Sequence, residues 1–198
     1  MGKIICFMGK SSTGKDTLFR KLLAYREPEL TTLVPYTTRP LRDGETEGIE
    51  YFFTDEEGYR NYLQSGKIIE ERTYDTYYGL WRYFMVDDGN IDLEHKNYAM
   101  IGTLEAYNKL CAYYGKEKIL PILIEVDDGI RLKRALSREM KQDSPKYEEM
   151  CRRYLADCED FSEDKIRAAG IDKRFFNHDF RQCLKEIRKY IIEDTKKS

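Results

Sequence analysis

The chain has 198 residues, which is enough for one domain or for one domain with a small insertion, and too few for a large multidomain assembly. Hydrophobic residues make up 41% and charged residues 35%, a balance typical of a globular fold rather than of a disordered chain. The 34 Lys and Arg residues meet 36 Asp and Glu residues, so the formal net charge is -2. A general nucleic-acid binder would carry a basic excess, and we therefore expect no nucleic-acid partner.

The ends of the chain and its cysteines bear on its location. No apolar run approaches the roughly 18 residues that a membrane span requires, and residues 1–6 contain no signal-peptide pattern. Cys6 stands where a myristoylation motif requires Ser or Thr, so we expect no membrane partner and a cytoplasmic location. The five cysteines form no C-x-x-C pair, which favours neither a disulfide framework nor a zinc site. Cys151 and Cys158 lie two helical turns apart, and we expect their thiols to be buried in a helix core.

The first half of the chain contains a strand, a helix and then an irregular stretch. The apolar run at 3–8 predicts a buried strand, and apolar residues at helical spacing in 18–23 predict a helix that Pro28 stops. Prolines and glycines between 33 and 60 indicate a loop-rich excursion. Within and just after this stretch we expect a strand at 49–53, a helix at 55–64 and extended chain at 67–72.

The second half alternates strands and helices. Strands are expected at 97–101 and 119–126, and Pro121 indicates that the edge or first residues of the latter lie off the ladder. Helices are expected at 104–114, 128–140, 145–160 and 180–192. The alternation predicts an α/β fold in three layers, with a mostly parallel central sheet covered on both sides. The core would comprise about 1–32 and 96–198, with an insertion at about 33–95.

A phosphate-binding loop follows the first strand. The residues Gly9-Lys10-Ser11-Ser12-Thr13-Gly14-Lys15 match G-x-x-x-x-G-K, the P-loop pattern, between a strand and a helix. The glycines let successive backbone N–H groups point at phosphate oxygens, and Lys15 reaches the outer phosphates as a point charge. We predict that residues 9–17 bind ATP; a glycine turn that binds nothing is the alternative.

Asp16 stands where this loop usually carries Ser or Thr, whose hydroxyl helps to hold Mg²⁺. The Asp16 carboxylate would take the metal directly or through water, or Thr17 would supply the hydroxyl one position later. The alternative is that Asp16 only complements the helix dipole in the first turn. Asp16 and Thr17 are thus the candidate Mg²⁺ ligands.

Two arginines follow in the irregular stretch, in Thr37-Thr38-Arg39-Pro40-Leu41-Arg42-Asp43-Gly44-Glu45. Arginines three residues apart on a loop can converge on one phosphate, because the planar guanidinium donates two parallel hydrogen bonds. This segment, with Gly48-Ile49-Glu50-Tyr51-Phe52-Phe53, Ile68-Ile69-Glu70 and Tyr77-Tyr78-Gly79, resembles the guanylate kinase family in order and spacing. The resemblance covers essentially the whole chain and is strongest from residue 4 to residue 79.

The resemblance implies a P-loop NTPase-type core, a monophosphate-binding insertion and a mobile helical lid at about 138–153. It implies that Arg39, Arg42, Tyr51 and Tyr78 hold the acceptor phosphate, and that Glu70 reads guanine. Arg138 and Arg153 resemble the two lid arginines that close over the transferring phosphoryl group. They lie 15 residues apart, about four more than the family pattern, and Arg134 competes for the role of Arg138.

The departures from the family pattern fall on positions that read the base or support the metal, whereas the positions that hold phosphate are kept. Pro35 and Leu80 replace serines, and Thr103 stands where the guanine-reading Asp is expected, so that Thr103 becomes the candidate acceptor contact. Each lost partner weakens discrimination between bases. We therefore hypothesise relaxed base selectivity with phosphoryl transfer retained.

The expected function is ATP-dependent phosphorylation of a nucleoside monophosphate, GMP first, to the diphosphate, with Mg²⁺ as cofactor. One alternative is a kinase for another nucleotide or another small phosphorylated acceptor on the same fold. Another alternative is a non-catalytic module that binds phosphorylated peptides in the pocket that holds the acceptor nucleotide in the family's enzymes. The sequence does not predict the oligomeric state.

Overall fold

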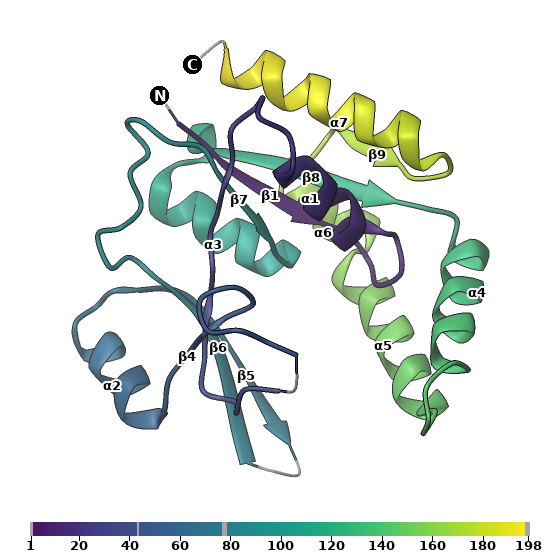
Figure 1. Ribbon diagram of the computed structural model, residues 1–198, viewed down its shortest axis with the longest axis horizontal. Helices are drawn as coiled ribbons and strands as arrows, with labels where there is room; N and C mark the ends of the chain where they lie inside the picture. Colours follow the sequence, from purple (N-terminus) through teal and green to yellow (C-terminus); the bar gives the residue numbers. More distant parts are fainter. Residues whose placement is uncertain (1, 43, 77–78, 197–198) are drawn as a thin grey trace.

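The computed structural model describes residues 2–42, 44–76 and 79–196, and its centre is a five-stranded sheet (Figure 1). The strand order is β2-β7-β1-β8-β9, and every pairing described in this sheet is parallel, as the alternating sequence predicts. The strands are β1 (Ile4–Met8), β2 (Thr31–Thr32), β7 (Tyr98–Ile101), β8 (Ile119–Glu125) and β9 (Arg174–Phe176). This arrangement confirms the α/β fold with a mostly parallel central sheet.

Helices cover both faces of the sheet because the central strand β1 is apolar on both sides. Alternate residues of β1 enter two different hydrophobic clusters, as the two-residue period of a strand requires. On one face the cluster includes α3 (Leu104–Tyr114) and α6 (Glu163–Ala168). On the other face it includes α1 (Lys15–Leu23) and α7 (Phe180–Thr195); in Figure 1, α7 runs along the top and α1 crosses in front of the sheet. The result is three layers.

A second sheet, of order β4-β3-β6-β5, is built from residues 36–86 and lies below the core in Figure 1. Its elements are β3 (Tyr36–Thr37), β4 (Phe52–Phe53), α2 (Glu56–Gln64), β5 (Ile68–Thr76) and β6 (Gly79–Val86). Strands β5 and β6 pair antiparallel, with a register shift between Ile68 and Glu70. Phe84 and Tyr59 are buried between the sheet and α2. The insertion boundaries at 33 and 95 stay a prediction.

Two helices, α4 (Asp128–Glu139) and α5 (Tyr147–Asp160), lie side by side at the other end of the core, on the right of Figure 1. Arg131 of α4 is 1% exposed and joins them: its guanidinium lies 3.8 Å from the ring centroid of Tyr154 and pairs with Asp157 at 3.3 Å. The contact between α4 and α5 is therefore centred on the Arg131–Asp157 ion pair and not on a row of buried apolar side chains.

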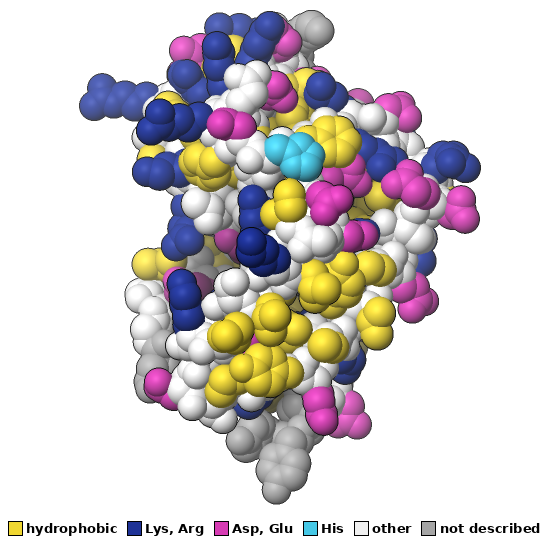
Figure 2. All heavy atoms as spheres, turned by 90° about the vertical axis from the view of Figure 1, so that its right-hand side faces the viewer, with side chains coloured by type: hydrophobic (Ala, Val, Ile, Leu, Met, Phe, Trp, Pro, Cys, Tyr) yellow, Lys and Arg dark blue, Asp and Glu magenta, His cyan; other side chains and the backbone are white. Residues whose placement is uncertain are grey.

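The expected burial of Cys151 and Cys158 is wrong. Cys151 is exposed and Cys158 is half-buried, and α5 contributes no fully buried residue. The reason is that the helix packs along one side only, against α4, and most of its surface meets solvent. Figure 2 views the molecule from this end and shows apolar side chains gathered on the surface. The exposed large apolar residues of the two helices are Ile130, Leu132, Leu136, Tyr147 and Leu155, and the exposed Met140 directly follows α4.

Three predicted element boundaries need correction. Helix α1 ends at Leu23 and not at Pro28, because residues 24–27 are exposed and offer no apolar face to bury. The strand expected at 49–53 is reduced to Phe52–Phe53, because a turn occupies 48–50. Strand β5 runs on to Thr76, since it pairs with β6 along its length.

Pro121 lies inside the ladder and not before it. It stands opposite Cys6 in the register of β8 with β1, whereas the pairing of β8 with β9 begins only at Leu123. Pro121 therefore occupies a stretch of β8 that is paired on one side, where a missing N–H is tolerated. Within the described part of the chain, no helix combines the length and the apolar character needed to cross a bilayer.

Candidate active site

The phosphate loop joins β1 to α1 in a conformation that requires its glycines. Gly9 has φ +146° and Gly14 has φ +88°, both in the region that side chains disfavour. A Cβ on Gly9 would lie 2.3 Å from the Ile124 carbonyl oxygen, and one on Gly14 would lie 2.5 Å from Asn177 Nδ2. The loop is thus packed tightly against the carboxyl end of the sheet, where α/β folds bind ligands.

Some polar groups of the loop are hydrogen-bonded within the loop, whereas the hydroxyl of Ser12 is not. Thr13 Oγ1 donates to the Lys10 carbonyl at 2.9 Å, which closes the loop on itself. Ser12 has φ +66°, and its buried hydroxyl has no hydrogen-bond partner among the described residues. A buried hydroxyl without a partner costs free energy, and a phosphate oxygen would satisfy it. The geometry therefore fits an anionic ligand.

Asn177 and Arg134 support the loop from outside, and the sequence analysis missed the first of them. Asn177 is 4% exposed; its Nδ2 donates to the Thr13 carbonyl at 2.7 Å, and its backbone N–H donates to Glu125. Arg134 approaches the carbonyls of Thr13 and Asn177 at 3.5 Å each. Arg134 thus faces the base of the phosphate loop, whereas Arg138, one turn later, does not make these contacts.

Lys15 and Asp16 open α1. Lys15 Nζ lies 3.8 Å from Asp16 Oδ2, while Asp16 and Thr17 are exposed. Mg²⁺ prefers oxygen ligands and usually takes one or two protein groups together with substrate phosphates and water. No group of three or more His, Cys, Asp or Glu side chains that could hold a metal ion occurs in the described residues. An exposed carboxylate and hydroxyl at the mouth of a phosphate loop fit Mg²⁺ by their chemistry.

A cavity of about 350 Å³ is lined mostly by α4 and α5 and reaches the phosphate loop at Ser11. Its lining includes Ser11, Arg42, Arg138 and Arg153, so the structure brings together the loop and three of the predicted arginines. Glu149 restrains Arg153 through a 2.7 Å hydrogen bond. Because Arg152 and Arg153 both donate to it, the pKa of Glu149 falls to about 2.

Helix α5 also contacts the loop directly. The Ser11 backbone N–H donates to Asp157 Oδ2 at 2.7 Å, and the same oxygen accepts from Arg131 at 3.3 Å. A carboxylate thus occupies one of the loop N–H groups that would face a phosphate.

Arg39 is 3% exposed and forms a bidentate pair with Glu45. Its Nη1 and Nη2 atoms lie 2.7 and 2.6 Å from the two carboxylate oxygens. The hydrogen bonds from Arg39 lower the pKa of Glu45, and those to Glu45 raise the pKa of Arg39. The Arg39 guanidinium also lies 5.0 Å from the centroid of the Tyr51 ring. The backbone N–H of Arg42 donates to Glu45 at 3.0 Å, so one carboxylate organises both arginines.

Glu70 is 2% exposed and lies on β5 of the insertion sheet. Its Oε1 pairs with Arg72 at 3.3 Å, and burial raises the pKa of Glu70. The sequence analysis missed Arg72, although its signal was available: on a strand, residues two apart share a face.

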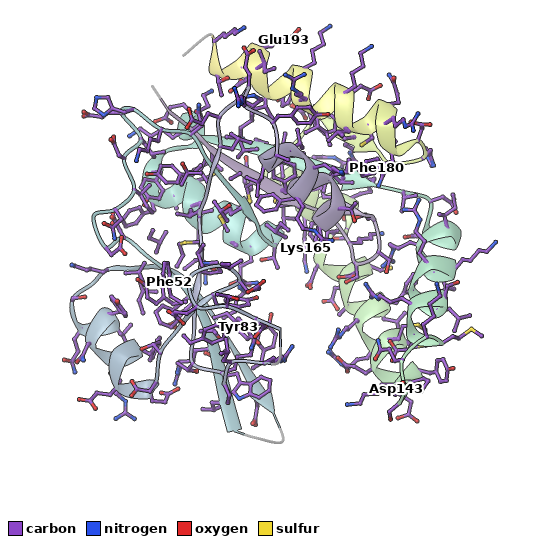
Figure 3. The ribbon with its side chains drawn as sticks, in the orientation of Figure 1. Phe52, Tyr83, Asp143, Lys165, Phe180 and Glu193 are labelled. Carbon is purple, nitrogen blue, oxygen red and sulfur yellow. The ribbon has the colours of Figure 1, made fainter. Side chains whose placement is uncertain are left out.

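Thr103 caps a helix and also lines a cavity, and its role as an acceptor contact stays a prediction. Its hydroxyl accepts from the Ala106 N–H at 3.2 Å and caps α3. Thr103 also lines a cavity of about 650 Å³ with Arg72, Tyr74 and Lys165. In Figure 3, Lys165 marks the core side of this region and Tyr83 the insertion sheet. Tyr78, the remaining predicted acceptor residue, lies outside the described residues.

A phosphate loop at the carboxyl end of a parallel sheet, faced by arginines from an insertion and a helical pair, defines a P-loop phosphotransferase. The sequence model of the family described as Guanylate kinase matches residues 1–82. A guanylate kinase of Porphyromonas gingivalis is 31% identical over 196 residues, which are 98% of each chain. The chain belongs to the guanylate kinase family.

Two further comparisons agree with this assignment. A guanylate kinase of Nostoc is 40% identical over 79 residues, 39% of either chain. The crystal structure of guanylate kinase from Anaplasma phagocytophilum superposes with a TM-score of 0.66 at 18% identity. It covers 96% of this chain and 84% of its own, and it shows the shared P-loop NTPase-type fold.

Proposed function

We propose that this enzyme transfers the terminal phosphoryl group of ATP to GMP and so produces ADP and GDP. Family membership supports the reaction, and the observation that carries it is the cavity between the phosphate loop and the helical pair. Ser11 of the loop, Arg42 of the insertion and the lid arginines Arg138 and Arg153 all line it. Cationic groups from the insertion and from both lid helices therefore face the place where a phosphoryl group would move.

Such a transfer asks the protein mainly for alignment and for positive charge, with little covalent work. Lys15 and the loop N–H groups bind the donor phosphates, while Arg39, Arg42 and Tyr51 hold the acceptor phosphate. We propose that Arg138 and Arg153 stabilise the charge on the moving group. A general base is unnecessary, because the attacking phosphate oxygen is already anionic near neutral pH.

Helices α4 and α5 act as the lid in this proposal. Closure over the loop excludes water, so that ATP is not lost to hydrolysis. Asp157 already touches the Ser11 N–H from α5. The triphosphate would have to displace this carboxylate from the loop, or share the N–H with it.

Asp16 and Thr17 would hold the Mg²⁺ that accompanies ATP. When bound, the ion neutralises charge on the donor phosphates. The enzyme's location is part of the proposal too: all five cysteines are free thiols, which favours the cytoplasm.

The test of the function is ADP formation from Mg·ATP with GMP, dGMP, AMP, CMP and UMP offered separately. We expect turnover with GMP to exceed that with AMP, CMP or UMP, because Glu70 accepts from the donors on the guanine edge. Comparable turnover of several bases would contradict this expectation and would support relaxed base selectivity instead. Absence of turnover with every nucleotide would contradict the proposal.

The pH dependence of GMP use should report the ionisation of Glu70. Burial raises the pKa of Glu70 above its ordinary value, so lowering the pH protonates a carboxylate that must accept hydrogen bonds. We expect kcat/KM for GMP to fall as the pH drops through this raised pKa, and Glu70→Gln to lose about tenfold at neutral pH.

The contribution of Glu70 to the free energy of unfolding should change with pH in the direction opposite to kcat/KM, so that it is larger at low pH. The folded state binds the Glu70 proton more tightly than the unfolded state does, so this carboxyl contributes less stability as the pH rises from its unfolded to its folded pKa. Thermal unfolding of the wild type and of Glu70→Gln between about pH 5 and pH 8 measures this difference. A parallel pH dependence in the two proteins would contradict the assignment to Glu70.

A further inference from the structure

Two neighbouring side chains of β5 each carry a buried polar atom without a hydrogen-bond partner in the described part of the chain. The atoms are Oε2 of Glu70, an acceptor, and Nε of Arg72, a donor. The same two side chains already pair once, Arg72 Nη2 with Glu70 Oε1 at 3.3 Å. Burying unpartnered polar groups is costly, and such a site invites a ligand that supplies both partners.

Strand β5 places Glu70 and Arg72 on the same face of the insertion sheet, the face that carries Tyr83. Glu70 and Arg72 are two residues apart and share a face, while Glu71 between them accepts from Tyr59 on the α2 side. In the register of the hairpin, Arg72 stands opposite Tyr83. Tyr83 in turn contacts Tyr51, with ring centroids 5.5 Å apart. The pair therefore faces the same side as the ring that we assign to the acceptor site.

A ligand in the 650 Å³ cavity would meet Arg72 before Glu70. The Arg72 side chain is 22% exposed and lines the cavity, whereas the Glu70 side chain is fully buried. A free carboxylate would offer two acceptor oxygens to a base. Here Arg72 takes up one of them, and the site offers one acceptor and one donor instead.

We propose that Arg72 is a specificity-determining residue that reads the acceptor base together with Glu70, an inference that rests on the proposed function. Arg72 Nε–H donates to the 6-oxygen of a 6-oxopurine, and Glu70 Oε2 accepts from the neighbouring N1–H. Because Glu70 Oε1 is held by Arg72, the 2-amino group of guanine is read weakly. The pair thus selects 6-oxopurine monophosphates as a class and separates GMP poorly from IMP, which lacks the 2-amino group.

Three nucleotides and one variant test the two halves of this proposal. GMP, IMP and 6-thio-GMP are compared in the wild type and in Arg72→Met, which keeps an apolar side chain of similar reach and has no donor. In 6-thio-GMP a sulfur, which accepts hydrogen bonds weakly, replaces the 6-oxygen while N1–H is kept. Rates are measured above neutral pH so that Glu70 stays ionised in the variant.

The two preferences should change in opposite directions. In the wild type we expect kcat/KM for GMP to exceed that for 6-thio-GMP by about tenfold, and Arg72→Met should bring this ratio close to one. The ratio of GMP to IMP should instead rise by about tenfold in Arg72→Met, because Glu70 Oε1 becomes available to the 2-amino group. If Arg72 only neutralised the charge of Glu70, its replacement would not lower the ratio of GMP to 6-thio-GMP while raising the ratio of GMP to IMP.

Ratios within one preparation are independent of the fraction of folded enzyme, so partial loss of stability in Arg72→Met does not obscure the result. Arg60→Met, which removes an exposed charge from α2, serves as the control and should leave both ratios unchanged. Unchanged ratios in Arg72→Met would overturn the role of Arg72. If none of the three nucleotides is phosphorylated, the proposed function fails, and the same ratios of dissociation constants then decide the role of Arg72. If none of them binds, both proposals are overturned.

Discussion

Replacing Lys15 by Ala should lower kcat/KM by about 100- to 1,000-fold, the scale seen when one preorganised charge is removed from a transition state. Lys15 is the first residue of α1 and directly follows the last glycine of the phosphate loop. Its described ion pair, with the exposed Asp16 at 3.8 Å, is long and contributes little to stability. The loss should therefore appear in the rate of ADP formation and not in the melting temperature.

Lys21→Ala is the matched control, because Lys21 is an exposed lysine in the last turn of the same helix. It changes the net charge equally and should retain the wild-type rate. If Lys15→Ala kept more than about a tenth of the activity, the P-loop lysine would not carry the charge stabilisation that we assign to it.

The sequence predicts well those elements whose signal is local. The run before Gly9 and the G-x-x-x-x-G-K spacing are sufficient to place β1, the phosphate loop and the start of α1, because the glycines alone allow the backbone to turn there. The apolar alternation of β1 likewise predicts two covered faces. These features depend on residues close together in the chain.

Elements that depend on a distant partner are harder to predict. Strand β5 extends to Thr76 only because β6 pairs with it, and the polar residues near its end give no strand signal. Helix α5 has apolar residues at helical spacing, which predict a buried face, but α4 covers only one side of the helix. The burial of Arg131 between these helices depends on Tyr154 and Asp157, more than 20 residues further on.

The candidate site likewise contains residues that the local sequence predicts and contacts that depend on the folded chain. The motif residues Arg39 and Arg42 were predicted, but their arrangement around Glu45 follows from the loop conformation. Asn177 reaches the loop from 164 residues away, a distance over which one sequence carries no pairing signal. Thr103 was predicted from its position in the family pattern, whereas the structure shows its hydroxyl engaged as a helix cap.

Replacing Arg39 by Ala should lower kcat/KM for GMP by about 100-fold or more, because two charge-assisted hydrogen bonds to the acceptor phosphate are lost. In the structure the fork of Arg39 is held by Glu45 at 2.6 and 2.7 Å. The substitution should therefore also cost about 1–3 kcal/mol of stability, since the Glu45 carboxylate loses its partner. GMP titration of the initial rate and thermal unfolding measure the two effects.

Glu45→Gln separates these effects, because it breaks the same ion pair and leaves the arginine in place. We expect a loss of stability comparable to that of Arg39→Ala, but a decrease of less than about tenfold in kcat/KM for GMP. Arg39 lowers the pKa of Glu45, so the stability that this pair contributes is present above the unfolded pKa of the carboxyl and disappears as the pH falls through its folded pKa. The stability gap between the wild type and Glu45→Gln should close accordingly in acid. Equal losses of GMP use in the two variants would mean that Arg39 serves only to fold the loop; unequal losses at equal stability would assign it to the acceptor phosphate.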